Sequence, residues 1–168
     1  MDVRQAIKER RSIRKYQNRV VEEKILAEVL EAARLAPSAN NRQDWRFVAV
    51  KDREQIDKLV SATGQSFIGT APIVIAGVAL NPERVMRCEV PAYAVDVAIA
   101  MTNITLAATA NGLGTCWIGS FDQVEVKRIL EIPEEYKVVQ LMPLGYPDEK
   151  PEARSRKPLA EVVSYDKF

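Results

Sequence analysis

A run of basic residues near the N-terminus is the segment with the clearest capacity for chemistry. In Glu9–Tyr16, ERRSIRKY, four of the eight residues are cations, although the whole chain has only 24 basic residues against 23 acidic ones. Arg10, Arg11 and Arg14 offer forked guanidinium donors that suit the oxygens of a phosphate. The Ser12 hydroxyl lies among them and adds a further donor. A solvated, charged turn explains these residues about equally well, so the run alone leaves both interpretations open.

A second, smaller basic group, Arg154-Ser155-Arg156-Lys157, follows near the C-terminus. Alone, it is typical of a solvated tail. If the fold brings it to the first group, two Arg/Ser groups that are distant in the sequence converge on one phosphate. A nucleic-acid site is disfavoured, because acidic residues flank the first group, no aromatic residues interleave with it and no long basic stripe extends it. We therefore expect no nucleic-acid partner.

A polar loop, Ala36–Trp45 (APSANNRQDW), separates a predicted helix from a predicted strand. Its hydroxyl and amide side chains crowd next to Trp45, which suits a flat ligand rich in heteroatoms. A helix-ending turn built from Asn and Ser explains the same composition. The loop therefore indicates a binding site only in combination with other features.

A glycine-rich segment, Asn111–Asp122 (NGLGTCWIGSFD), is the third candidate. It matches neither the dinucleotide-binding fingerprint nor the P-loop. Glycines would still let backbone N–H groups approach a ligand closely. A helix cap followed by a tight turn explains Gly112 and leaves Gly119 without an explanation.

The chain contains no histidine. This excludes Ser-His-Asp and Cys-His arrangements, histidine-ligated metals and the commonest acid–base group near neutral pH. Cys88 and Cys116 form no CxxC pair, so neither a cysteine-built metal site nor a disulfide framework is indicated. We expect both thiols to be buried and without a redox role, and no bound metal.

Nothing near the N-terminus predicts targeting. The segment MDVRQAIKERR lacks the apolar core of a signal peptide. The longest apolar run, Pro72–Leu80, is far shorter than the ~20 residues of a membrane span. Together with the thiols, this predicts a cytoplasmic protein without a membrane partner.

The elements that position these segments alternate between helix and strand within one predicted domain, residues 1–168. Periodicity and end signals predict helices over 2–10, within 21–37, over 53–63, over 92–111 and after Asp122, and strands over 46–50, 73–80 and 137–146. The order indicates a layered α+β or mixed α/β structure and leaves its topology open. The helix over 92–111 is apolar nearly all round, which is typical of the centre of a domain or a dimer.

Taken in order, these segments resemble the FMN-dependent nitroreductase family, whose members are NAD(P)H:acceptor oxidoreductases. The resemblance rests on RRSIRKY after the first helix, APSANNRQDW after the second, SFIGTAPIVI before a buried strand, the long helix ending in GLGTCWIGSFD, and LGYPDEKPEARSRKPL near the C-terminus. No single motif is decisive, and the order and spacing extend over nearly the whole chain.

The resemblance implies an α+β, three-layer fold in which helices flank a mixed sheet and the long central helix lies at a dimer interface. It also implies an intertwined homodimer with two tightly bound FMN molecules at the interface, each touched by both chains. The positions that match the family's phosphate contacts are Arg10, Arg11, Ser12 and Arg14, with Arg154 and Arg156 from the tail. Those that match its ring contacts are Pro37, Ser38, Ala39 and Asn41, with Gln65 as a further candidate and the backbone of Ile118 and Gly119 near the reactive nitrogen.

The reaction implied by the resemblance is a ping-pong exchange. NAD(P)H reduces the bound FMN and leaves, and a nitroaromatic, quinone or similar small-molecule acceptor takes its place. Because the chemistry occurs at the cofactor's own nitrogen, no catalytic side chain is implied, which accounts for the missing histidine.

Two departures from the family pattern limit what the resemblance implies. Asp44 stands where the family usually has proline, which predicts a less rigid loop and a carboxylate near the mouth of the site. The chain is also short and lacks most of the substrate-covering insertions of longer members. The acceptor and the choice of NADH or NADPH stay open, and so do two alternatives: a specialised branch (a reductive dehalogenase or flavin-fragmenting enzyme) and a non-catalytic flavin-binding module.

Overall fold

The structure is a computed structural model that describes residues 1–168, and the elements predicted from the sequence are present with bounds that agree within three residues. The helices are α1 (Val3–Glu9), α2 (Glu23–Arg34), α3 (Arg53–Thr63), α4 (Ala92–Ala110) and α5 (Gln123–Ile129), with short 3-10 turns η1 (Ala39–Asn41), η2 (Ser66–Thr70) and η3 (Leu159–Glu161). The strands are β1 (Trp45–Val50), β2 (Ile73–Ala79), β3 (Gly114–Thr115) and β4 (Lys137–Gly145).

The sheet has the strand order β1-β2-β4-β3, and neighbouring strands are antiparallel in each of its ladders. The expected mixed sheet is therefore antiparallel apart from one isolated parallel bridge, between Ser12 and Thr115. Burial does not fix strand direction: β2 is buried along its whole length because helices cover both faces, not because its neighbours run parallel to it.

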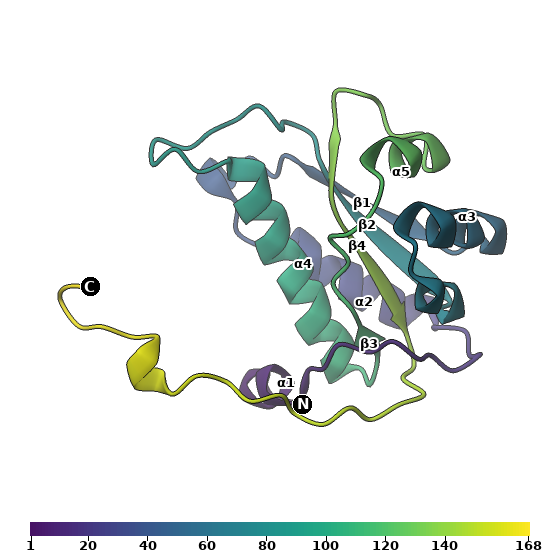
Figure 1. The fold of residues 1–168 in the computed structure, drawn as a ribbon, viewed down its shortest axis with the longest axis horizontal. Helices are drawn as coiled ribbons and strands as arrows, with labels where there is room; N and C mark the ends of the chain where they lie inside the picture. Colours follow the sequence, from purple (N-terminus) through teal and green to yellow (C-terminus); the bar gives the residue numbers. More distant parts are fainter.

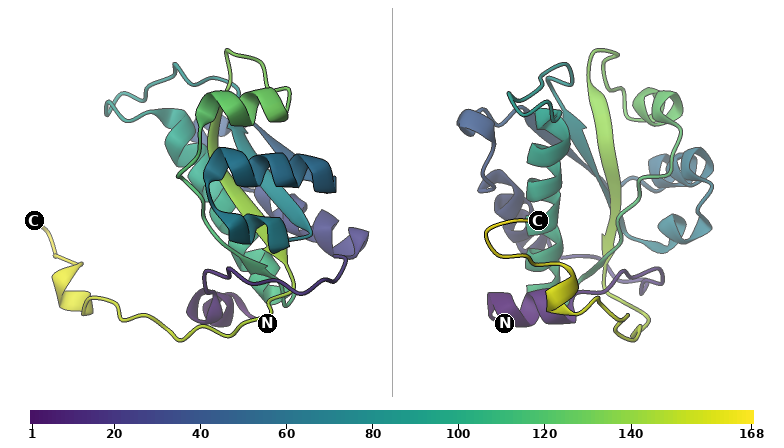
Figure 2. Two further views of the ribbon diagram at one scale, coloured as in Figure 1. Left: turned by 45° about the vertical axis from the view of Figure 1, so that its right-hand side comes forward. Right: turned by 60° about the vertical axis from the view of Figure 1, so that its left-hand side comes forward.

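The fold has three layers, with α1, α2 and α4 on one face of the sheet and α3 and α5 on the other (Figure 2). Alternate residues of β2 supply the two halves of the core. Ile73 and Ile75 pack in the cluster shared with α2 and α4. Val74 and Ala76 pack in the cluster shared with α3 and α5. The predicted α+β class and helix-flanked sheet are confirmed.

The long helix α4 lies against the centre of the sheet, where Gly77 permits a close approach. A Cβ atom at Gly77 would lie 2.9 Å from Cγ1 of Val97. By length and composition alone α4 could cross a membrane, a property that it shares with the core helices of water-soluble domains. Gly112 follows the helix with φ +74°, the left-handed conformation predicted for a helix-ending glycine.

The C-terminal segment leaves the body of the domain as an extended chain that contains only η3 (Figure 1). Several of its apolar side chains lie in solvent, among them Leu159, Val162, Tyr165 and Phe168. This segment has no packing partner within its own chain.

Candidate functional site

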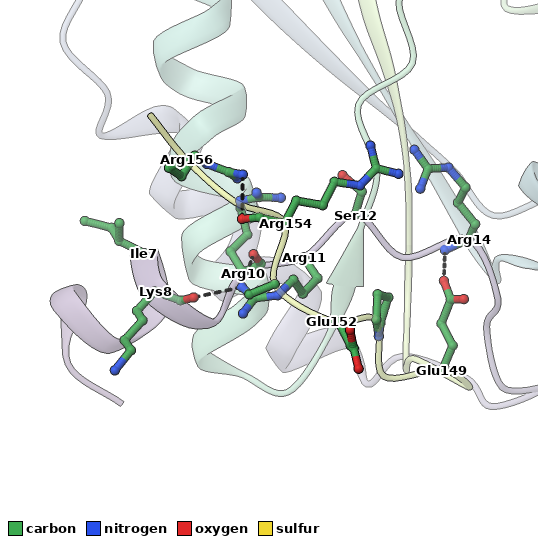
Figure 3. A pocket seen from close by; sticks show the side chains of 12 residues that line it. Ile7, Lys8, Arg10, Arg11, Ser12, Arg14, Glu149, Glu152, Arg154 and Arg156 are labelled. Atoms are coloured by element: carbon green, nitrogen blue, oxygen red, sulfur yellow. Dashed lines mark hydrogen bonds between the residues drawn. The ribbon is translucent and has the colours of Figure 1, made fainter. Parts of the chain in front are cut away.

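The two basic groups predicted from the sequence meet at one cavity of about 700 Å³ (Figure 3). It lies between the end of α1, the connector that follows it and residues 149–156. The predicted residues that line it are Arg10, Arg11, Ser12, Arg14, Arg154 and Arg156. The fold therefore brings together all the positions that the resemblance matched to phosphate contacts.

The guanidinium groups at this cavity differ in what they bind. Those of Arg10, Arg14 and Arg154 make no hydrogen bond or ion pair within the chain. Nη1 of Arg11 instead donates to the carbonyls of Lys8 and Arg10, at 2.8 and 2.9 Å, and so covers the C-terminal end of α1. The guanidinium N–H groups of Arg10, Arg14 and Arg154 are thus free to bind a ligand. In Arg11, Nη1 is instead hydrogen-bonded to the backbone.

The connector directly after α1 has an extended backbone, and its pairing with Thr115 holds it in place. Ser12 forms its bridge with Thr115, and the Ile13 N–H donates to the Thr115 carbonyl at 2.9 Å. Because side chains alternate along an extended chain, the buried Ile13 points inward. Ser12 and Arg14 point the other way, into the cavity.

Three further charged residues line the cavity and were not predicted: Lys8, Glu149 and Glu152. The Glu149 carboxylate accepts the backbone N–H of Arg14, so it fastens the segment after β4 to the connector. Composition gave no signal for this contact, because a Glu in the Pro-rich stretch PDEKPE reads as a solvated residue.

The glycine-rich segment lies along the sheet edge beside this connector. Ile118 is buried and exchanges two backbone hydrogen bonds with Leu141, at 2.9 and 3.1 Å. Gly119 faces open space, since a Cβ atom there would meet nothing within 4 Å. Nε2 of Gln65 reaches the Ser120 carbonyl at 3.5 Å, so Gln65 and Gly119 border the same surface. Trp117, which was not among the predicted site residues, is 43% exposed on the same segment.

The two cysteines differ in environment. Cys116 is buried, as expected, and burial raises the pKa of its thiol, opposed in part by the nearby Arg14 guanidinium and Ser12 hydroxyl. It is therefore a neutral thiol near pH 7. Cys88 is exposed, so the prediction that both thiols are buried is wrong: the residue lies on the 81–91 loop, which rises from the surface before α4.

The polar loop with Pro37, Ser38, Ala39 and Asn41 is not part of the basic cavity. It lies at the N-terminal end of α4, where the Asp96 carboxylate accepts the Ala39 N–H at 3.0 Å. The end of α1, which lines the basic cavity, lies near the opposite end of the helix (Figure 1). From Asp96 to the helix end at Ala110 the axis spans about 21 Å. Within one chain, the ring contacts predicted for this loop therefore lie far from the predicted phosphate contacts.

Asp44 is half-buried and pairs with Arg84, with Nη1 and Oδ2 3.6 Å apart. Its carboxylate is therefore not free, because a cation from the 81–91 loop faces it. Sequence reasoning could not pair these residues, which lie on different connections at the same end of the sheet.

The sequence and the fold match known proteins over most of their length. The model of the nitroreductase family matches residues 7–71 and 62–146. A nitroreductase relative from Methanothermobacter thermautotrophicus is 39% identical over 166 residues, covering 92% of this chain and 82% of the relative. The FMN reductase (NAD(P)H) of Bacillus subtilis is 29% identical, covering 96% and 72%. A solved structure of an FMN-dependent nitroreductase from Clostridium difficile R20291 gives a TM-score of 0.85 at 30% identity, covering 97% and 98%.

Proposed function

Because the chain belongs to the nitroreductase family, we propose that it is an FMN-dependent NAD(P)H oxidoreductase that passes electrons to a nitroaromatic, quinone or similar small-molecule acceptor. The observation that carries the proposal is the convergence of two basic groups, distant in sequence, on one cavity. The names of the Bacillus and Clostridium proteins support the cofactor, and the former supports the electron donor.

The cavity residues fit the phosphate of FMN. The unpaired guanidinium groups of Arg10, Arg14 and Arg154 supply charge-assisted donors, and the Ser12 hydroxyl supplies one more. Arg156 donates to the carbonyls of Arg154 and Ser155, at 3.1 Å each, and completes the positive wall. When bound, FMN supplies hydride and electron transfer at its own ring, so the protein need only bind and orient it.

A complete ring site requires a second chain. Gln65, Ile118 and Gly119 lie on the same side of the fold as Arg14, whose guanidinium lies 5.9 Å from the centre of the Phe67 ring. The loop with Ser38 and Asn41 is at the other end of α4, too far away for the same FMN molecule. We therefore assign that loop, with Pro37 and Ala39, to the FMN whose phosphate the partner chain holds.

Two surface features support a homodimer. The outer face of α4 carries an open apolar groove lined by Ala94, Val95, Ala98, Ile99, Thr102 and Asn103. The exposed apolar residues of the C-terminal segment also lack a partner within the chain. A second copy on α4, with the C-terminal segments crossing between the two, would cover both surfaces, because apolar groups gain free energy when they leave water. A cytoplasmic location belongs to the same proposal.

The purified protein tests this function directly. We expect a yellow protein whose visible absorbance is bleached by NADH or NADPH without oxygen and restored by a nitroaromatic or quinone. A colourless protein that gains no FMN on titration would overturn the proposal. A bound flavin that NAD(P)H leaves oxidised would instead support the flavin-binding module without turnover.

A further inference from the structure

The polar loop adopts an unusual backbone. Asn40, Asn41 and Gln43 have φ of 56°, 54° and 55°, in the left-handed region that non-glycine residues rarely enter. Asn tolerates this region better than Gln does. Three such residues within four positions persist only where surrounding contacts hold them. Within the loop, the Gln43 N–H donates to the Ser38 hydroxyl at 3.0 Å. The question is which contacts hold this loop in place.

Ala39, at the start of the loop, is held through both of its backbone polar groups. Its N–H donates to the buried Asp96 carboxylate at 3.0 Å. Its carbonyl accepts from Nη1 of Arg84 at 3.5 Å. The same Nη1 faces Asp44, the last residue before β1. Arg84 therefore lies between the beginning and the end of the loop.

The Asp44–Arg84 pair is partly shielded from solvent, so water screens its charges less than those of an exposed pair. The side chains of Arg84 and Asp44 are 19% and 32% exposed. Oδ2 of Asp44 is buried and accepts no hydrogen bond, so Arg84 is the charge that compensates it. Removing one partner of an ion pair shielded to this degree costs more than removing one partner of a fully exposed pair, because the remaining charge is left partly buried without compensation.

We propose that Asp44 and Arg84 are positioning residues that hold the 38–43 loop in its ring-facing conformation. The proposal rests on the assignment of this loop to the FMN ring. The Asp44–Arg84 ion pair then restrains the loop at the position where the family usually has proline. The segment that carries Arg84 is itself fixed by a bridge between Val85 and Pro91 and by a hydrogen bond from the Met86 N–H to the Val90 carbonyl at 2.9 Å.

A double-mutant cycle on the full-length protein tests the pair. The variants are Asp44→Asn, Arg84→Gln and their combination, with Arg87→Gln, an exposed cation on the same segment, as the matched control. We measure FMN affinity by fluorescence quenching, and amide hydrogen exchange of residues 38–43 without FMN. Each single variant should weaken FMN binding about 3- to 10-fold and speed exchange in the loop. The double variant should bind FMN no more weakly than the single variant with the lower FMN affinity.

The control should behave as the unmodified protein does. The inference is overturned if Asp44→Asn leaves both FMN affinity and loop exchange unchanged, or if the two single effects simply add. The proposed function fails separately, if the unmodified protein does not bind FMN. In that case loop exchange still decides whether the pair holds the loop.

Discussion

The Ile13 side chain lies directly against Gly114: a Cβ atom at position 114 would be 2.5 Å from Cγ1 of Ile13. This contact packs the connector after α1 against β3. It therefore fixes the position from which Ser12 and Arg14 point into the basic cavity. It also explains why a glycine stands here although its φ is ordinary. The requirement is space for Ile13, not backbone freedom.

Gly114→Ala should therefore be destabilising. The added methyl group overlaps the buried Ile13, and overpacking of this kind costs about 1–3 kcal/mol. Urea unfolding followed by circular dichroism measures the loss. Gly119→Ala is the matched control, because open space surrounds that position, and its free energy of unfolding should stay within about 0.5 kcal/mol of the unmodified value. Equal stabilities for the two variants would contradict the packing argument.

Substitution of Arg10 and Arg14 together by alanine should abolish retention of FMN during purification. Each charge-assisted contact to phosphate that is lost should cost about 1.5–3 kcal/mol of binding free energy. Flavin content per chain, from the visible absorbance, measures the effect. Lys15→Ala is the control, since Lys15 pairs with Asp148 at 2.9 Å outside the cavity. Stoichiometric flavin in the double variant would reject the phosphate assignment.

Arg11→Ala should affect flavin retention less than Arg10→Ala. The Arg11 guanidinium is hydrogen-bonded to the carbonyls at the end of α1, so its removal should mainly loosen that helix. Isothermal titration of the FMN-free proteins separates the two variants. Equal losses of affinity would show that Arg11 leaves the helix end when the phosphate binds.

The contact of Glu22 with Tyr146 and Arg19 predicts a pH dependence of stability. The Tyr146 hydroxyl, donating to the carboxylate, is the main cause that lowers the pKa of Glu22 from 4.5 to about 2, and Arg19 adds to it. A lowered pKa stabilises the folded state above pH 4.5, and the contribution is lost as the pH falls from 4.5 towards 2. Unfolding midpoints should show Glu22→Gln less stable than the unmodified protein at pH 7, with a difference that shrinks as the pH falls towards 2 and disappears at lower pH. A difference of the same size at pH 7 and at pH 2 would contradict this origin.

The sequence was sufficient for the five helices and the three longer strands, and it raised the possibility that the two basic groups line one cavity. Periodicity and caps located the helices, because they reflect local physics: the Asp122 carboxylate accepts the Glu125 N–H at 2.9 Å, as the capping pattern predicts. The strand directions, the pairing of Asp44 with Arg84 and the exposure of Cys88 depend on which connections meet in space. The residue types in these connections do not indicate which connections lie next to each other in the folded chain. The convergence of Arg154 on Arg10 was expected only because two basic groups of similar composition were present.

The most direct test of the shared FMN site uses two defective variants in one dimer. Arg10→Ala/Arg14→Ala removes the phosphate contacts, and Ser38→Ala/Asn41→Ala removes the ring-loop contacts. We expect each homodimer to lose FMN, and the co-expressed heterodimer, isolated through two different tags, to retain one FMN per dimer. That retention follows because one of its two sites then combines an intact basic cavity with an intact loop. A heterodimer as empty as both homodimers would contradict the account.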